Sequence, residues 1–266
     1  MPAPPVTAQN CAHALEATRA AGPLVQCLTN IVVANWTANV LLALGAAPAM
    51  VDNPHEARQF AQVAGAVLVN LGTPYEDTVA AMTLAAEGAA AANTPWVLDP
   101  VAAGGLTWRT EHARRLLAAS PTIVRGNASE IQGLAGGAGG RGVDSADTPD
   151  QVADTARGLA RRLGRTVAVS GASDLITDGE RVVRVDNGHE WMTRVTGVGC
   201  SLGALMAAFA AVTSPLVAAT AATVVLCVAA EDAAATTRGP GTFASALLDE
   251  LWLITPARLA ERARLT

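Results

Sequence analysis

A short glycine motif, Thr196-Gly197-Val198-Gly199-Cys200, lies directly before an alanine-rich stretch that is predicted to form a helix. Glycines at the start of a helix let the backbone approach a ligand closely, and the first N–H groups point outward with the helix dipole behind them. We expect these groups to form an anion hole for a phosphoryl group in transfer. A tight turn followed by a buried cysteine is the simpler alternative, and the motif alone leaves both open.

Cys200 is the candidate catalytic residue of this motif. The positive end of a helix dipole lowers the pKa of a thiol in the first turn, and such a group can accept a proton from an attacking alcohol. Residues 199–203 also match the GxSxG nucleophile elbow of hydrolases, which requires a histidine after the serine. All the histidines precede Ser201, so the hydrolase hypothesis fails; they are His13, His55, His112 and His189.

Polar residues follow several short apolar segments of the strand type. In open parallel sheets, ligands bind outside the carboxyl ends of the strands, so these positions are candidate site residues. Asp99 could organise Mg²⁺ or a water, or could simply start the turn at Pro100. Met50 also falls at a strand end, where it could contact a small apolar ring or pack in the core. The polar positions are Asn30, Asp52, Asn70, Asp99, 125–130 and Ser170-Gly171.

The segment Arg125-Gly126-Asn127-Ala128-Ser129-Glu130 marks a change from strand to helix. Asn127 is predicted to cap the helix, with Glu130 reaching back as in a capping box. A functional interpretation places Glu130 near a hydrated Mg²⁺ and Arg125 against nucleotide phosphates. The two interpretations are compatible.

Composition excludes several mechanisms. All eighteen basic residues are arginines, so the chain lacks a Walker A lysine, a Schiff-base lysine and the strand lysine of protein kinases. Phosphate chemistry must therefore use arginine, backbone N–H groups and a metal. A formal net charge of −5 without a basic run argues against nucleic acid as a partner.

Alternation of short apolar segments with longer helical ones predicts an α/β fold with a mostly parallel sheet. Asp178-Gly179 predicts a hairpin turn within 174–187, and helices should follow at 199–213, 215–236 and 242–264. We expect a single domain over 1–266, with 136–144 as a surface loop. The expected strands are 24–30, 48–51, 66–72, 95–100, 121–127 and 166–171, and the expected helices before the hairpin are 35–44, 54–64, 75–92, 109–119, 127–135 and 149–163.

Location follows from three further observations. The four cysteines form no CxxC pair, and residues 1–10 lack the features of a signal peptide. Residues 201–230 carry no charge, but Ser214-Pro215 divides them into two pieces that are each shorter than the ~20 residues of a membrane span. We therefore expect a cytoplasmic protein that does not enter a membrane.

Six segments in this order share the pattern of one known family. They are CLTNIVVANWTANVLLALGAAPAM (27–50), NLGT (70–73), VLDPVAAG (97–104), VRGNASEI (124–131), GVDS (142–145) and DGERVVRVDNGHEWMTRVTGVGC (178–200). Together they resemble the hydroxyethylthiazole kinase family of thiamine salvage. That family resembles ribokinase in fold, with helices on both faces of the sheet and no lid domain, and it forms homotrimers with active sites between subunits. The resemblance implies transfer of the ATP γ-phosphoryl group to 4-methyl-5-(2-hydroxyethyl)thiazole.

Site roles carried over from this resemblance fall into three groups. Met50 and Gly197 would contact the thiazole with Asn30 close by, and Cys200 stands where related sugar and pyrimidine kinases carry an aspartate base. ATP would contact Arg125, Ser170 and Gly199, while Mg²⁺ and its waters would be organised by Asp99 and Glu130. The sequence departs from the family pattern at Val198, which replaces a threonine, and at Ser170, where threonine is frequent.

Two alternatives keep the same fold: an ATP-dependent NAD(P)H-hydrate dehydratase and a hydroxymethylpyrimidine kinase. Both would be expected to carry aspartate where this chain has Cys200. A third alternative is a nucleotide-binding protein without catalysis, which loss of Arg125, Glu130 or the glycines would favour. All of these residues are present.

Overall fold

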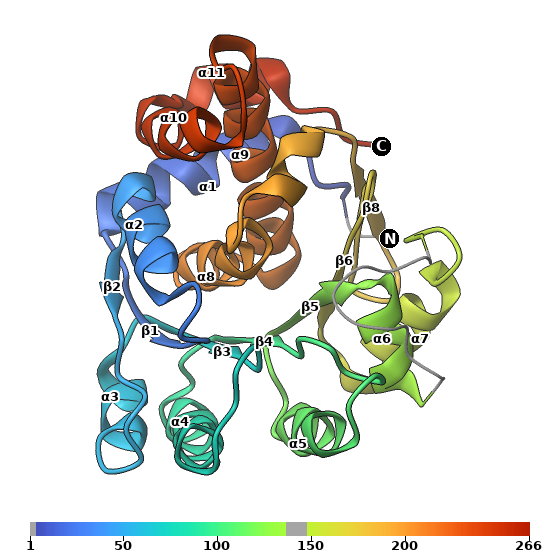
Figure 1. Cartoon of the computed structure of the whole chain (residues 1–266). Helices are drawn as coiled ribbons and strands as arrows, with labels where there is room; N and C mark the ends of the chain where they lie inside the picture. The colour runs from blue at the N-terminus through green and yellow to red at the C-terminus, as the bar shows by residue number, and fades with distance from the viewer. Residues whose placement is uncertain (1–3, 137–147) are drawn as a thin grey trace.

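The computed structural model of the chain describes residues 4–136 and 148–266. Most of the segment expected as a glycine-rich surface loop, 136–144, and the GVDS segment at 142–145 lie outside the described residues. The rest of the chain forms alternating strands and helices, as the apolar pattern predicts (Figure 1).

Eight strands in the described residues form one sheet in the order β2-β1-β3-β4-β5-β6-β7-β8. All pairs from β2 through β6 are parallel, whereas β7 is antiparallel to both β6 and β8. The expected hairpin at Asp178-Gly179 is confirmed between β7 and β8. The strands are β1 (Leu24–Leu28), β2 (Ala47–Ala49), β3 (Ala66–Asn70), β4 (Trp96–Asp99), β5 (Ile123–Asn127), β6 (Thr166–Ser170), β7 (Asp174–Thr177) and β8 (Val182–Val185).

Helices cover both faces of the sheet, which explains the continuous apolar runs of the central strands. In the view of Figure 1, one layer lies below the sheet and to its right, and the other lies above it. The lower layer contains α3 (Ala57–Val63), α4 (Glu76–Ala92), α5 (Thr107–Ala118), α6 (Ala128–Ala135) and α7 (Ala153–Leu163). The upper layer contains α1 (Ala8–Ala21), α2 (Ala34–Leu44), α8 (Val198–Ala210), α9 (Pro215–Thr236), α10 (Pro240–Leu253) and α11 (Pro256–Arg262), with the short 3₁₀ helix η1 (Glu190–Arg194).

Pro215 begins α9 at a position where its missing N–H costs nothing, as the division at Ser214-Pro215 predicts. The helix then continues through Glu231 and Asp232 to a length of 22 residues, so it is longer than the uncharged piece considered alone. It is long and apolar enough to cross a membrane, but 83% of its most apolar window is buried inside the protein. Its apolar surface is buried by packing against α1, α8 and α10.

Three elements differ from the sequence expectations. Helix α1 was not expected, although Thr7 and Asn10 form a capping box at its start. Helix η1 was also not expected. The single helix predicted over 242–264 is wrong: it is two helices, because Thr255 caps a new helix that begins at Pro256.

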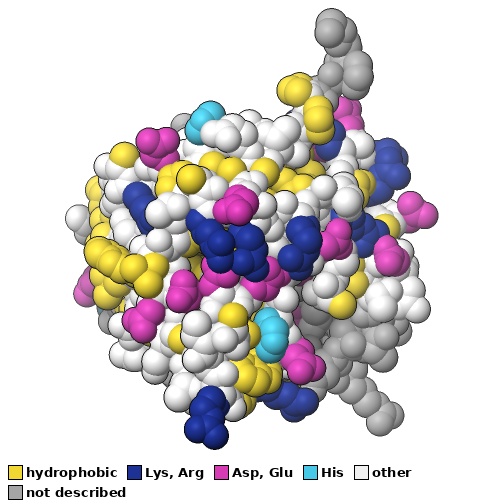
Figure 2. All heavy atoms as spheres, turned by 90° about the horizontal axis from the view of Figure 1, so that it is seen from above, with side chains coloured by type: hydrophobic (Ala, Val, Ile, Leu, Met, Phe, Trp, Pro, Cys, Tyr) yellow, Lys and Arg dark blue, Asp and Glu magenta, His cyan; other side chains and the backbone are white. Residues whose placement is uncertain are grey.

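Opposite charges alternate on the face formed by the upper helices (Figure 2). Arg262 pairs with both Glu231 and Asp232, and Arg258 pairs with Asp232. Arg258 and Arg262 on this face therefore lie beside acidic groups that balance their charges.

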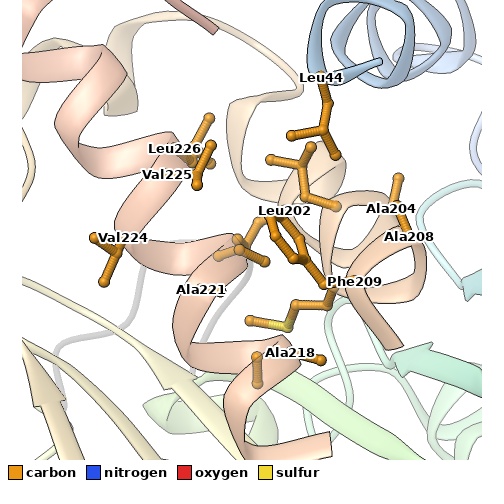
Figure 3. Close-up of a cluster of buried hydrophobic side chains, with 14 of the residues drawn as sticks. Leu44, Leu202, Ala204, Ala208, Phe209, Ala218, Ala221, Val224, Val225 and Leu226 are labelled. Atoms are coloured by element: carbon orange, nitrogen blue, oxygen red, sulfur yellow. The ribbon is translucent and has the colours of Figure 1, made fainter. Parts of the chain in front are cut away.

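Packing between α8 and α9 depends on Phe209, whose ring is fully buried among alanines and branched side chains (Figure 3). We expect Phe209→Ala to lower the free energy of unfolding by about 3–5 kcal/mol, because the cavity cannot be filled by neighbouring alanines. Val63→Ala, at a position that is 69% exposed on α3, is the control and should change it by less than about 0.5 kcal/mol. Urea denaturation measures both, and equal effects would contradict this account of the core.

Candidate active site

Polar side chains from five neighbouring strands meet at one edge of the sheet, beside the start of α8. Parallel strands all end at this edge, so residues that are far apart in the sequence come together. Asn30 lies two residues beyond β1, and Asn70, Asp99 and Ser170 are the last residues of β3, β4 and β6. Arg125 lies within β5, and Cys200 lies in the first turn of α8. The group that the hydrogen bonds connect is Asn30, Asn70, Asp99, Arg125, Ser170 and Cys200.

Arg125 is the buried centre of this group. Its Nη1 lies 3.0 Å from Asp99 Oδ2 and donates to the Gly199 carbonyl at 2.7 Å, while its Nη2 donates to Ser170 Oγ at 2.9 Å. The side chains of Arg125 and Asp99 are 8% and 1% exposed. One guanidinium thus joins β4, β6 and the first turn of α8, which a lysine could not do with the same geometry.

Asp99 is a carboxylate with only one of its oxygens satisfied. Oδ2 accepts from Arg125 and from Asn70 Nδ2, the latter at 2.7 Å. Oδ1 is buried and has no hydrogen-bond partner in the described residues. Burial raises the pKa of Asp99 in spite of the opposing charge of Arg125 and the Asn70 hydrogen bond. An unsatisfied, buried oxygen in a binding region fits a group that supplies positive charge or a proton.

Glu130 performs the predicted capping role. Its Oε2 accepts the Asn127 N–H at 2.8 Å, and Asn127 Oδ1 accepts the Glu130 N–H at 2.9 Å. Its Oε1 accepts the Ala102 N–H at 2.9 Å, so it also fixes the loop after β4. Burial, followed by the charge of Asp99, raises the pKa of this carboxyl group. Among the described residues, no three histidine, cysteine or acidic side chains gather closely enough to hold a metal.

The turn before α8 has an accessible backbone. Gly197 adopts φ +97°, and no side chain in the described part of the chain caps the helix start. A Cβ on Gly199 would meet no atom within 4 Å, whereas a Cβ on Gly197 would lie 2.9 Å from atoms of Trp36 and Val33. The turn is therefore tightly packed on the Gly197 side and open at Gly199, which is compatible with an anion approaching the first N–H groups of α8.

The expectation that the helix dipole lowers the pKa of Cys200 is wrong in its net direction. Burial raises the pKa of the thiol and the charge of Asp99 raises it further, against the effects of Arg125 and the Asn70 and Asn30 amides. The thiol is consequently protonated at neutral pH. It can take a proton from an alcohol only after it has given its own proton to solvent and become a thiolate.

Met50 and Asp52 do not join the hydrogen-bonded group. Met50 lies one residue beyond β2, the strand at the edge of the sheet, and is 38% exposed. Asp52 is exposed in the following segment. A surface cavity of about 460 Å³ lies elsewhere, between the ends of α9, α10 and α11, and none of the candidate site residues lines it.

Two residues near the site gave no signal in the sequence analysis. Trp36 packs against Gly197, and Gly72 lies so close to Asn30 that a Cβ would come within 2.4 Å of the Asn30 Nδ2. The position of Gly72 two residues after a strand-end asparagine could have indicated a close approach to its backbone.

The sheet order, the two helical layers and the polar strand ends define an α/β protein of the ribokinase-like class. A ribokinase-like superfamily protein from Enterococcus faecalis has the same fold, with a TM-score of 0.61 at 14% identity over 96% of this chain and 92% of that one.

Closer relatives identify the family. The profile of the hydroxyethylthiazole kinase family matches residues 15–257. A hydroxyethylthiazole kinase from Kineococcus radiotolerans is 60% identical over 246 residues, 90% of each chain. The structure of the hydroxyethylthiazole kinase protein from Pyrococcus horikoshii OT3 matches with a TM-score of 0.89 at 38% identity, over 96% of this chain and 98% of that chain. The chain belongs to the hydroxyethylthiazole kinase family.

Asp174 supports the end of β6 from the first position of β7. Its Oδ1 accepts the Gly171 N–H at 2.9 Å, directly after Ser170, and Cys227 Sγ lies 3.8 Å from its Oδ2. Burial raises the pKa of Asp174 to about 6, in spite of the Gly171 hydrogen bond and the more distant charge of Arg125.

A pH dependence of stability follows from this shift. The folded protein holds the Asp174 proton up to a higher pH than the unfolded chain, so this group makes stability fall as pH rises from about 4 to about 6. Asp174→Asn should remove that dependence. The free energy of unfolding of the variant, relative to that of wild type, should therefore increase by up to about 3 kcal/mol between pH 4 and pH 7. Urea denaturation across this range tests it, with the exposed Asp52→Asn as control; a pH-independent difference between Asp174→Asn and wild type would refute the expectation.

Proposed function

We propose that the protein, as a single domain over 1–266, transfers the γ-phosphoryl group of ATP to the hydroxyl of 4-methyl-5-(2-hydroxyethyl)thiazole, a step of thiamine salvage in the cytoplasm. Membership of the hydroxyethylthiazole kinase family supports this activity. The observation that carries it is the open Gly199 turn at the start of α8, held from behind by the buried guanidinium of Arg125. A lysine-free chain needs such a combination to receive phosphate charge.

Binding of the thiazole is assigned to the part of the site nearest β1 and β2. Gly197, Met50 and Asn30 would surround the ring and its hydroxyethyl arm. Support comes from the partial exposure of Met50 and from the Asn30 amide, which donates to Cys200 Sγ at 3.6 Å. These positions are compatible with a small alcohol whose hydroxyl lies close to the thiol.

Binding of ATP is assigned to Arg125, Ser170 and the Gly199 backbone. The hydrogen bonds from Arg125 to Ser170 and to the Gly199 carbonyl place these three groups side by side. Phosphoryl transfer needs mainly positioning and charge stabilisation, with little covalent chemistry from the protein. Outward-facing N–H groups in the first turn of α8 would supply fixed partial charge where negative charge develops.

Mg²⁺ would be held by Asp99 and Glu130. The buried Asp99 Oδ1 without a partner fits a cation or one of its waters. Glu130 would act through water, since each of its oxygens already accepts a backbone N–H. When bound, the ion would neutralise phosphate charge that Arg125 alone cannot balance.

Cys200 would orient the substrate hydroxyl and would take its proton as the thiolate. The thiol must first give its own proton to solvent, and its raised pKa keeps the thiolate a minor species before the reaction. As the alcohol oxygen bonds to the γ-phosphorus and the bond to ADP breaks, the alcohol proton becomes strongly acidic and passes to the sulfur, which is left as the neutral thiol.

A homotrimer with active sites between subunits is part of the proposal. Large apolar side chains are exposed in the segments that follow β1, β3 and β4, at the same edge of the sheet as the site. A partner subunit would bury this surface and close the site. The side chains are Ile31, Val32, Tyr75, Leu106 and Trp108. Light scattering coupled to size-exclusion chromatography should give three times the 27.0 kDa chain mass, and a monomeric mass at micromolar concentration would contradict the trimer.

ADP release, measured with ATP, Mg²⁺ and a panel of alcohols, tests the reaction. The hydroxyethylthiazole should be turned over at least about tenfold more efficiently than hydroxymethylpyrimidine. Hydrated NADH in the same assay tests the dehydratase alternative. Absence of thiazole-dependent ADP release from a folded protein would refute the proposal.

Replacement of Cys200 tests the proposed proton acceptor. Cys200→Ala should lower kcat about tenfold to a hundredfold and change KM less, because the thiol acts on the developing charge more than on binding. Cys200→Asp should keep substantial activity, because a carboxylate restores a base at this position. Steady-state kinetics measure both, and an unchanged kcat in Cys200→Ala would remove the thiol from the mechanism.

A further inference from the structure

Asn70 is a fully buried asparagine at the end of β3, in the middle of the candidate site. Its Nδ2 donates to Asp99 Oδ2 at 2.7 Å, while its Oδ1 accepts from Asn30 Nδ2 and from the Gly72 N–H, both at 2.9 Å. The β3–β4 register pairs Asn70 directly with Asp99. From this geometry we infer that Asn70 is a positioning residue for the transfer, which holds Asn30, Asp99 and Cys200 in one fixed arrangement.

The orientation of the Asn70 amide is determined by its neighbours. The Gly72 N–H can only donate, so it requires an oxygen opposite it. The amide NH₂ must then face Asp99, whose Oδ2 accepts. Because both ends of the amide have a partner of the matching type, a flipped Asn70 would place a donor against a donor and an acceptor against an acceptor.

This orientation continues to the thiol. Since Asn70 Oδ1 takes one hydrogen of the Asn30 amide, the Asn30 Nδ2 can direct its other hydrogen to Cys200 Sγ at 3.6 Å. Hydrogen bonds from Asn30 and Asn70 to the sulfur lower the thiol pKa, against the dominant effect of burial. A donor to sulfur stabilises the charged form, so the amides favour the thiolate, the state in which Cys200 can accept the alcohol proton.

Close packing around Gly72 provides an independent observation. A Cβ at this position would come within 2.4 Å of Asn30 Nδ2 and 2.6 Å of Asn30 Cβ and Cγ. The Asn30 side chain can therefore keep its place only beside a glycine. The chain thus fixes Asn30 from two sides, through the Asn70 amide and through the absence of a side chain at 72.

Asn70 itself is inaccessible, so the role inferred for it is indirect. It rests on the proposed function, in which Cys200 and Asn30 face the alcohol and Asp99 faces the phosphate. The inference adds a link between these two halves of the site. A change at Asn70 should therefore affect the chemical step more than substrate binding.

Asn70→Ala tests the inference with Asn187→Ala as the matched control. Asn187 is also a buried asparagine with three hydrogen bonds, to Glu231 Oε1, the Arg262 carbonyl and the Arg264 N–H, none of which belongs to the candidate site. Both variants should lose stability. Only Asn70→Ala should lower kcat, by about tenfold to a hundredfold, with a smaller rise in the KM for the thiazole.

A second readout does not depend on turnover. Cys200 is partly exposed, whereas Cys11, Cys27 and Cys227 are buried, so iodoacetamide labelling of the folded protein reports on Cys200. The pH midpoint of the labelling rate, followed by mass spectrometry of the Cys200 peptide, should rise by about half a unit or more in Asn70→Ala. Asn187→Ala should keep the wild-type midpoint.

Gly72→Ala serves as a second variant and should show the same two changes, because it displaces Asn30 and leaves Asn70 in place. If Asn70→Ala does not fold, Gly72→Ala decides the question. A wild-type kcat and labelling midpoint in either folded site variant, or equal losses in Asn187→Ala, would overturn the inference. If wild type fails to phosphorylate the thiazole, the proposed function fails, and the labelling midpoints still decide whether Asn70 positions the thiol.

Discussion

A buried ion pair between Arg125 and Asp99 is the interaction on which the candidate site depends. Two charges removed from water are costly unless their remaining donors and acceptors are also satisfied. Ser170 and the Gly199 carbonyl accept hydrogen bonds from the guanidinium, and Asn70 donates to one carboxylate oxygen, while Arg125 Nε and Asp99 Oδ1 have no hydrogen-bond partner in the described residues. Each of these hydrogen bonds leads to a different element, so the bonds that stabilise the buried ion pair also fix the start of α8 relative to the sheet.

Arginine is suited to this position by its shape as well as its charge. A planar guanidinium can donate in several directions at once from one rigid group, whereas an ammonium on a flexible stem cannot reproduce those directions. The chain contains no lysine, and at the site Arg125 supplies the fixed positive charge while its hydrogen bonds also support the structure. The same bonds leave the edge of the turn at Gly199 open, since the guanidinium approaches from inside the protein.

The fold could be predicted largely from the sequence because its central strands are buried on both faces and several of them end in polar residues. The parallel sheet, the hairpin at Asp178-Gly179 and the capping box of Asn127 and Glu130 all follow local rules. Helix α1 is not evident from the sequence because its apolar pattern is weak. The break at Ile254 is not evident either, because the helical pattern continues past Pro256, which is compatible with the first turn of a new helix. In the site, the strand-end positions were predictable, but the direction of the Cys200 pKa shift was not. Burial and the proximity of Asp99 are tertiary effects, and they exceed the helix dipole that the sequence reveals.

A thiol at position 200 is consistent with the charge balance of this site. Arg125 carries one positive charge, while Asp99 and Glu130 are both buried carboxyl groups whose pKa values are raised by burial. A permanently ionised group at this position would add negative charge beside them and weaken binding of the triphosphate. A neutral thiol adds no charge while substrates bind, and the amides of Asn30 and Asn70 stand ready to stabilise the negative charge that it acquires on losing its proton. Cys200, which stays neutral in the free protein, is therefore compatible with an anionic substrate. The amides of Asn30 and Asn70 limit how far burial raises the pKa of its thiol.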